Sequence, residues 1–428
     1  MCHRFAGYDR LRRSALIRLS FADRRQMKST FPKGRAKHRF CRCGSLSPAF
    51  IRGLAHSSAG NAQNMKNERT AFVLLQKCCP FFALRGDFLA HKIGKQTIII
   101  DGAVGVAATA AVGSKKEGEG PLGADFDIIN EDSRFGEKTW EKAESAMQKA
   151  AANAALGKCG RALGDVDFIF AGDLLNQCIA SGYGARGAGV PFVGLYGACS
   201  TYAEASALGA VFADGPARLC LALASSHFCS AERQYRFPLE YGGQRPPSAQ
   251  WTATAAGAAV LEKDGAAPFV KAVTFGTVED FGINDQNNMG AAMAPAACAT
   301  LAQFFRDTYS APEDYDLIAT GDLGYVGAEL LRELMSKEGF VLGENYNDCG
   351  LMLYDRKRQQ TEAGASGCGC SAAVASGHIL PRMKHGELKN VLLVSTGALM
   401  SPTSVQQGET IPGVAHLVCY SAEKGGIF

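Results

Sequence analysis

The sequence predicts an α/β protein with a five-layer αβαβα body built from two stacked, duplicated halves. An irregular, basic N-terminal extension is predicted to precede this body. Three observations lead to this prediction. Predicted strands and helices alternate along the body, three short sequence blocks occur twice in the same order, and the charge changes sign between the extension and the body.

The net charge of +4 hides two unlike parts of the chain. Residues 1–91 contain 18 Lys and Arg against 4 Asp and Glu, and the rest contains 27 against 37, so the two parts carry +14 and −10. An acidic body lacks the electrostatic surface of a nucleic-acid-binding protein. We assign 1–91 to the basic extension, 92–265 to the N-terminal half and 266–428 to the C-terminal half.

The extension shows no sustained hydrophobic period, and three hypotheses for it stay open. It is a disordered basic arm that contacts an anionic membrane or nucleic acid, a small metal-binding module, or a dispensable stretch that natural selection has not kept as part of the protein. Four of its five cysteines, Cys41, Cys43, Cys78 and Cys79, are the candidate ligands of the metal module. Their spacing is poor for a zinc site, so no metal ligand is predicted. The scattered cysteines of the body indicate reduced, intracellular thiols, and no apolar stretch reaches the roughly 20 residues that span a bilayer.

Three pairs of similar blocks indicate the duplication. Each half contains an apolar run that ends in Gly-Asp-Leu, then a short Cys-Ser segment, then a second apolar run. The pairs are 166–174 with 315–323, 197–200 with 368–371, and 219–226 with 390–397. The last two pairs share an offset of 171 residues and the first has 149, which indicates a loop gained in the second half.

The elements follow these blocks in order. Ala-rich or amphipathic stretches predict helices, the first ended by Gly157, and short apolar runs predict strands. The predicted helices are 140–156, 201–212, 299–308, 328–337 and 371–379, and the predicted strands are 167–171, 219–224, 317–320 and 391–395. Alternation of this kind favours parallel sheets covered by helices on both faces.

Cys199 lies in a Gly-Ala-Cys-Ser turn before the helix predicted at 201–212. The dipole and free N–H groups of a helix N-terminus favour the thiolate, and small neighbours admit a substrate. Cys199 is therefore a candidate nucleophile. The alternative interpretation is a small buried residue at a tight turn.

Motifs throughout residues 94–421 carry a resemblance to a known family. They are GKQT at 94–97, EGPLG at 119–123, AGDLLNQ at 171–177, FVGLYGACST at 192–201, SSH at 225–227, AERQ at 231–234, EYGGQ at 240–244, MGAAMAPAA at 289–297, NDCG at 347–350, SGCGCS at 366–371 and TGALMSP at 396–402. The body resembles the thiolase/ketoacyl-synthase superfamily, and more closely the stage V sporulation protein AD family of spore-forming bacteria.

This resemblance implies a thiolase-like fold and the binding of dipicolinic acid (pyridine-2,6-dicarboxylate) or its calcium chelate. It implies a role in loading this acid into the developing spore, at the spore inner membrane, together with other stage V sporulation A-group membrane proteins. The protein is then expected to be cytoplasmic and peripheral to that membrane, and to form a homodimer. No cofactor is expected beyond Ca²⁺ carried with the ligand, and no nucleic-acid partner.

The sequence departs from acyl-condensing relatives at two positions. Those relatives carry a His where this chain has Thr320-Gly321-Asp322, and some carry an Asn where it has 366–370. His227 and His416 are candidates to stand in from other loops. The departures favour a non-catalytic binding protein. Two alternatives remain open: an acyl-CoA-dependent condensing or acyl-transfer enzyme with Cys199 as nucleophile, and a scaffold with a vestigial pocket.

A dicarboxylate requires donors at both ends and an apolar slot for its ring. Arg233 and Arg236 offer guanidinium groups, and Tyr235 and Tyr241 offer stacking surfaces. The aspartates of the two Gly-Asp-Leu blocks either cap loops or position the ligand, water or Ca²⁺. The candidate ligand-binding residues are Asp173, Leu174, Gln177, Cys199, Ser225, His227, Arg233, Arg236, Tyr241, Asp322, Cys370 and His416.

Overall fold

The computed structural model describes residues 90–235 and 245–425, which all lie in one compact unit, Ser58–Phe428. Nearly all of the predicted extension, as well as Arg236 and Tyr241, lies outside the described residues. Whether residues 92–265 and 266–428 are separate domains stays a prediction. Within the described residues, strand β9 ends at Glu262 and strand β10 begins at Phe269.

Thirteen of the described strands form one continuous sheet, whose two parts have the same strand order and join at a single antiparallel pair, Gly105 with Phe269. These two parts are called the first and the second sheet. The first sheet runs β3-β9-β7-β5-β6, with β3 Gly105–Ser114, β5 Phe168–Gly172, β6 Phe192–Leu195, β7 Leu219–Ser226 and β9 Ala255–Glu262. The second runs β10-β15-β14-β11-β12, with β10 Phe269–Phe275, β11 Leu317–Thr320, β12 Tyr346–Asp348, β14 Asn390–Ala398 and β15 Gly413–Ser421. Counted within each half, both sheets place strands 1, 5, 4, 2 and 3 side by side, so the duplication predicted from the sequence extends to the topology.

The sheets are mixed, and the prediction of parallel sheets is wrong in this respect. β7, β5 and β6 are parallel, whereas β9 is antiparallel to both β3 and β7. In the second sheet β15 is likewise antiparallel to both of its neighbours. β3 and β9 were not predicted from the sequence, because Ala and Gly dominate them and the β-branched and aromatic residues that indicate a strand are few.

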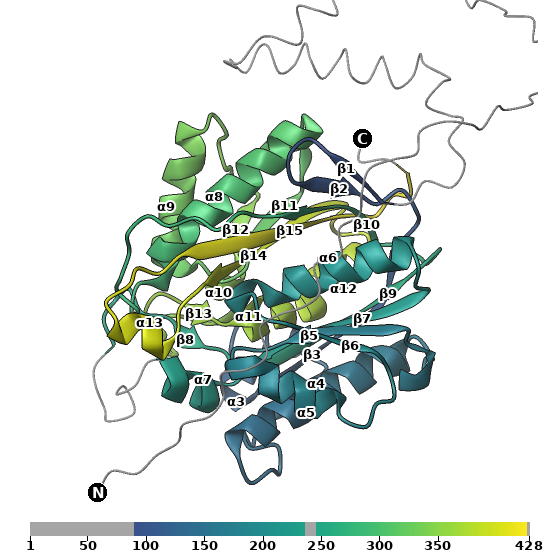
Figure 1. Cartoon of the computed structure of the whole chain (residues 1–428), viewed down its shortest axis with the longest axis horizontal. Helices are drawn as coiled ribbons and strands as arrows, with labels where there is room; N and C mark the ends of the chain where they lie inside the picture. Colours follow the sequence, from purple (N-terminus) through teal and green to yellow (C-terminus); the bar gives the residue numbers. More distant parts are fainter. Residues whose placement is uncertain (1–89, 236–244, 426–428) are drawn as a thin grey trace, which may run out of the picture. The chain divides into compact units, whose positions relative to one another are not determined.

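Helices complete the five layers (Figure 1). α4 Trp140–Lys158 and α5 Ile179–Ala185 cover the outer face of the first sheet, and α8 Met289–Thr308 packs on the outer face of the second, with α9 Gly324–Lys337 against it. α6 Thr201–Asp214 and α11 Cys368–Val374 lie between the sheets, where their buried residues join one central core. The predicted αβαβα fold class is confirmed.

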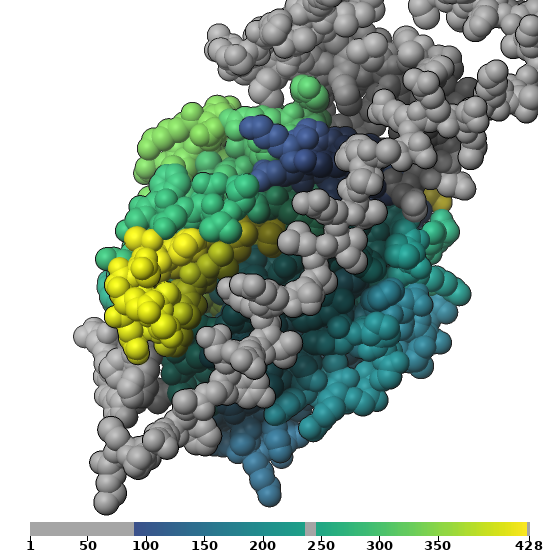
Figure 2. Space-filling model, in the orientation of Figure 1, coloured from purple at the N-terminus to yellow at the C-terminus, as the bar shows by residue number. Residues whose placement is uncertain are grey.

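Figure 2 shows the same arrangement as packed surface, with the green and yellow second half above the blue and teal first half. The dark-blue hairpin of β1 His91–Ile93 and β2 Thr97–Ile99 is an exception. It precedes the first half in the chain, but β2 pairs with β10 of the second half. The hairpin therefore ties the start of the described chain to the second sheet.

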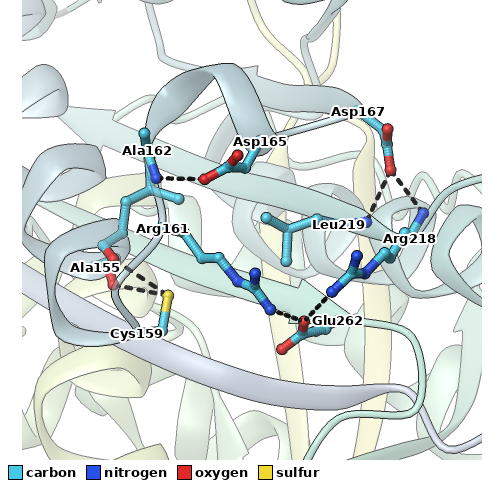
Figure 3. Close-up of polar contacts among 10 residues, drawn as sticks. Ala155, Cys159, Arg161, Ala162, Asp165, Asp167, Arg218, Leu219 and Glu262 are labelled. Atoms are coloured by element: carbon cyan, nitrogen blue, oxygen red, sulfur yellow. Dashed lines mark hydrogen bonds and ion pairs between the residues drawn. The ribbon is translucent and has the colours of Figure 1, made fainter.

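Equivalent aspartates of the two halves make equivalent contacts. Asp167, before β5, accepts hydrogen bonds from the backbone N–H groups of Arg218 (2.7 Å) and Leu219 (3.0 Å), as Figure 3 shows. Asp316, before β11, accepts from the N–H groups of Lys389 (2.7 Å) and Asn390 (2.9 Å). Each carboxylate fixes the start of a neighbouring strand, so the repeated Asp of the first sequence block has the same structural task in both halves.

Helix α4 ends two residues later than the sequence predicted. Thr139 caps its start by accepting from the N–H of Lys142 (3.3 Å). The helix continues through Gly157 to Lys158, and the chain then turns at Gly160 with a φ of +65°. The burial of Ala155 and Leu156 against the first sheet stabilises this last turn, which offsets the roughly 1 kcal/mol that one Gly costs in a helix.

We expect Gly157→Ala to raise the free energy of unfolding by about 0.5–1 kcal/mol, because Gly157 is helical and an added Cβ has no neighbour within 4 Å. Gly160→Ala is the matched control, since it also has open space but needs a left-handed φ of +65°. In that control, the free energy of unfolding is expected to fall by about 1 kcal/mol. Urea denaturation followed by circular dichroism measures both, and a destabilised Gly157→Ala would contradict the helical interpretation.

Candidate functional site

Cys199 lies on a tight turn at the seam between the two halves. Strand β6 ends at Leu195, and a single 3-10 turn, Ala198–Ser200, leads into α6. Ala198 adopts a left-handed φ of +51°. The Ser200 hydroxyl donates to the Gly197 carbonyl (2.6 Å) and the Thr201 hydroxyl to the Ala198 carbonyl (2.7 Å), which hold the turn in this conformation. The turn presents Cys199 to a cavity.

This cavity has a volume of about 390 Å³ and takes its walls from both halves. The first half supplies Leu174, Tyr196, Ala198, Cys199, Ala231, Glu232, Tyr235 and Thr252, and the second supplies Met289, Ser366, Ala398, Leu399, Met400, Ser401 and Ser404. Most of these side chains are apolar, and several others carry hydroxyl groups. Within the described part of the chain, no Lys, Arg or His lines the cavity. Its chemistry is that of a small-molecule pocket with hydroxyl donors.

A carboxyl group, Asp322, faces the Cys199 thiol from the second half. This fully buried carboxyl group and the thiol are close enough to shift each other's pKa. Asp322 accepts hydrogen bonds from the Gly367 N–H (2.8 Å), the Thr396 hydroxyl (2.9 Å) and the Ser366 hydroxyl (3.3 Å). Burial raises the pKa of Asp322 to about 6. Asp322 therefore stands at the position where the acyl-condensing relatives were expected to carry a His.

Burial and the neighbouring Asp322 both raise the pKa of the Cys199 thiol well above its usual value. Both effects oppose the thiolate that the helix N-terminus is expected to favour. Desolvation and a like charge both disfavour the ionised form, and here they outweigh the helix dipole. A protonated thiol is a poor nucleophile.

Asp173, the sequence counterpart of Asp322, occupies a different environment. It is fully buried and accepts from the Leu175 N–H (2.9 Å), the Ser181 N–H (2.8 Å) and the Ser181 hydroxyl (2.6 Å). It does not line the cavity. These contacts fit the loop-capping interpretation and bring Asp173 close to Glu144, whose pKa rises to about 8 through burial and the charge of Asp173.

The remaining candidate residues divide by location. Leu174 lines the cavity. The Cys370 thiol is buried, is not one of the lining residues and donates to the Gly321 carbonyl at 3.7 Å, next to Asp322 in the chain. Ser225 is buried and donates to Glu144 (3.0 Å). Gln177 is exposed, and Arg233 forms an exposed ion pair with Glu141. Of the twelve candidates, the structure therefore brings Leu174, Cys199, Asp322 and Cys370 together, and places the other described ones elsewhere.

Both candidate histidines are buried in structural hydrogen bonds. His227 donates from Nε2 to the Ser133 carbonyl (2.8 Å) and accepts at Nδ1 from the Cys229 N–H (3.2 Å). His416 accepts at Nδ1 from the Gly276 N–H (3.3 Å), and burial lowers its pKa to about 4. Burial also lowers the pKa of His227. Neither imidazole lines the cavity, so the expectation that one of them serves Cys199 as a base is not met.

Several lining residues, Tyr196, Ala231 and Glu232 among them, were not predicted from the sequence, whereas Tyr235 was named there as a stacking surface. The Tyr196 and Tyr235 hydroxyls donate to the Leu174 carbonyl and contact each other. On α7 Phe228–Tyr235, Ala231 and Glu232 lie four and three residues before Tyr235, spacings that place each of them beside Tyr235 on the helix surface. The segment 398–401 lies within the motif TGALMSP, which was noted only as part of the resemblance.

Two further findings concern the described residues alone. Among them, no three or more His, Cys, Asp or Glu side chains are arranged to hold a metal ion. None of the helices in residues 90–235 and 245–425 is long and apolar enough to cross a bilayer.

The five layers, the repeated strand order and a thiol on a tight turn at the seam define a thiolase-like α/β protein. Residues 94–421 match the family model described as Stage V sporulation protein AD (SpoVAD). The chain is also 42% identical over 333 residues to stage V sporulation protein AD of Bacillus subtilis (strain 168), covering 78% of this chain and 98% of that protein. The chain therefore belongs to the stage V sporulation protein AD family.

Solved structures of lower similarity include two enzymes. Human mitochondrial 3-ketoacyl-CoA thiolase in complex with CoA is 11% identical, with a TM-score of 0.48 over 77% of this chain and 100% of that chain. 3-Oxoacyl-[acyl-carrier-protein] synthase III from Aquifex aeolicus VF5 is 12% identical, with a TM-score of 0.44 over 74% and 99%. At these levels of similarity, nothing about the activity of the present protein follows from theirs.

Proposed function

We infer that the protein has a role in bacterial sporulation, because it belongs to this family. We propose that the cavity beside Cys199 binds dipicolinic acid, free or as its calcium chelate, without transforming it. Such binding supports uptake of the acid into the developing spore. The proposal includes a peripheral position at the spore inner membrane, contact with other stage V sporulation A-group membrane proteins, and a homodimer.

One observation carries the non-catalytic interpretation: Cys199 faces the carboxyl group of Asp322 instead of an imidazole base. Acyl transfer to a thiol needs a thiolate or a base that removes the thiol proton. Asp322 raises the pKa of the thiol, and neither His227 nor His416 lines the cavity. We therefore expect the Cys199 thiol to stay protonated in this site.

The cavity has the features that a flat aromatic acid requires. Its volume of about 390 Å³ falls within the roughly 300–1,000 Å³ of small-molecule sites. Leu174, Ala231 and Met289 offer apolar surface for a ring, and the tyrosine side chains offer aromatic faces. The side chains of Ser366, Ser401 and Ser404 also line the cavity. Their hydroxyl groups donate to Asp322, to the Ser404 hydroxyl and to the Ser401 carbonyl, so each would have to exchange this acceptor for a carboxylate oxygen of the ligand. Such donors are needed because burial of an unpaired carboxylate costs several kcal/mol.

Titration calorimetry of the full chain with dipicolinate tests this proposal. We expect a Kd between about 1 μM and 1 mM, which corresponds to roughly −8 to −4 kcal/mol. Ala231→Leu is expected to weaken binding by at least about tenfold, because the added atoms occupy cavity volume. Ser336→Leu on the exposed face of α9 is the matched control and leaves the Kd unchanged. Absence of heat with folded protein would refute the proposal.

The acyl-transfer alternative has its own readout. Incubation with an acyl-CoA followed by peptide mass spectrometry is expected to show no acyl adduct on Cys199. A stoichiometric thioester there, absent from Cys199→Ser, would overturn the non-catalytic interpretation and favour the enzyme. This outcome is independent of the calorimetric result.

A further inference from the structure

An ion pair forms part of the cavity wall, away from Cys199. Glu232, on α7, lines the cavity. Its Oε2 lies 3.3 Å from a guanidinium nitrogen of Arg245, and the two side chains are only 4% and 13% exposed. Glu232 is the one charged side chain among the described lining residues. The charge of the cavity wall therefore depends on what Arg245 contributes behind it.

Both partners are held in place by other groups. Glu232 Oε1 accepts from the Thr252 hydroxyl (2.9 Å) and the Thr252 N–H (3.4 Å). The Arg245 guanidinium lies over the rings of Trp251 (4.8 Å) and Phe228 (5.4 Å), which stack on each other. It also donates to the Gln250 carbonyl (2.8 Å). The pair is therefore a fixed, nearly buried element rather than a mobile surface contact.

A buried carboxylate in the wall opposes an anionic ligand. Charges in a partly buried site interact strongly because water and salt screen them little. Without compensation, Glu232 would repel each carboxylate of a dicarboxylic acid placed in the cavity. Arg245 offsets this charge from behind the wall. When Glu232 is replaced by a neutral side chain, the positive charge of Arg245 attracts an anion.

We propose that Arg245 is the charge-compensating, specificity-determining residue of this cavity, and that the Glu232–Arg245 pair sets its tolerance for anionic ligands. This inference rests on the proposed function, since it concerns the same pocket. It assigns selectivity to a pair outside the candidate residues predicted from the sequence, whose Arg233 lies in an exposed ion pair. Arg245 acts through Glu232 and is a positioning residue, because it is not itself among the lining residues.

A double-mutant cycle with charge-neutralising substitutions tests the proposal. Glu232→Gln, Arg245→Gln and the double variant are titrated with dipicolinate and with the neutral pyridine-2,6-dicarboxamide. We expect about tenfold tighter binding of dipicolinate to Glu232→Gln and about tenfold weaker binding to Arg245→Gln. The double variant restores a neutral wall, so its Kd should return to within about threefold of the wild-type value. Binding of the neutral diamide should change by less than about twofold in every variant, since no charge is involved.

The exposed ion pair of Arg306 and Glu338 is the matched control. Glu338→Gln and Arg306→Gln make the same charge changes at two positions that do not line the cavity, and they should leave the dipicolinate Kd unchanged. Circular dichroism confirms that each variant is folded. If Arg245→Gln does not fold, Glu232→Gln and the double variant still decide the sign of the effect.

The outcomes separate the inference from the proposed function. If the wild-type protein and all variants bind neither probe, the proposed function and the inference both fail. If the wild type binds dipicolinate and the cavity variants bind it equally well, the proposed function stands and the inference is overturned. The inference is also overturned if the diamide follows the same pattern as dipicolinate, because the effect would then be steric.

Discussion

Asp322→Ala is expected to lower the free energy of unfolding by about 3–5 kcal/mol. The substitution removes the acceptor of three buried donors, the Gly367 N–H and the hydroxyl groups of Thr396 and Ser366. Each donor left without a partner costs about 1–3 kcal/mol, and the release of a buried carboxylate offsets part of the sum. Urea denaturation at pH 7, followed by circular dichroism, measures the loss.

Asp322→Asn is the control for this prediction. The amide keeps an acceptor oxygen and nearly the same volume, so we expect a loss of only about 1–2 kcal/mol. Removal of the negative charge also lowers the pKa of Cys199, and the thiol should then react faster with iodoacetamide in the native protein. If Asp322→Ala were as stable as the wild type, the carboxyl group would not organise the seam as described.

The protein is expected to be more stable at pH 6 than at pH 8, by about 2 kcal/mol. Burial raises the pKa of Glu144 to about 8, of Asp348 to about 7 and of Asp322 to about 6. Their unfolded values are about 3.9–4.3. The folded state therefore holds more protons than the unfolded state over this range, and its stability falls as the pH rises through the folded pKa values.

His227 and His416 oppose this trend in part. Their pKa values are lowered in the folded state, so the unfolded chain takes up protons first as the pH falls through about 6.5. Together they reduce the expected gain by roughly 1–2 kcal/mol, which is included in the figure above. Urea midpoints at pH 6, 7 and 8 measure the slope, and Glu144→Gln should flatten it. Equal or greater stability at pH 8 would contradict the prediction.

The raised pKa values of Asp322 and Asp348 have the same cause, the burial of both carboxyl groups. Asp348 accepts from the Thr320 hydroxyl (2.7 Å) and from the N–H groups of Leu323 and Gly324 (2.9 Å each), directly behind Asp322. Each carboxyl group holds the ends of segments that meet only at the centre of the fold. We attribute their burial to this organising task, which stabilises the cavity walls even though ionisation there is unfavourable.

The sequence predicted much of the architecture where local signals were strong. The strand at 317–320 has the predicted bounds, and the helix predicted at 201–212 extends by two residues to Asp214. Helix α8 begins at Met289, ten residues before its predicted start, and contains Pro295. The region predicted as one helix at 371–379 is α11 followed by a π-helical turn, Ala375–Ile379. Gly290 and the internal Pro295 hid the start of α8, because Gly and Pro both disfavour a helix interior.

The sequence by itself determined the duplication, the fold class and the family. Each of these depends on residues close together in the chain or on a repeat that can be counted. Only the tertiary structure decided that Asp322 faces the thiol, that both histidines lie elsewhere, and that Glu232 and Arg245 form a charged wall. The cavity collects side chains from residue 174 to residue 404. Contacts between such distant residues depend on how the two halves pack, and no local pattern records that packing.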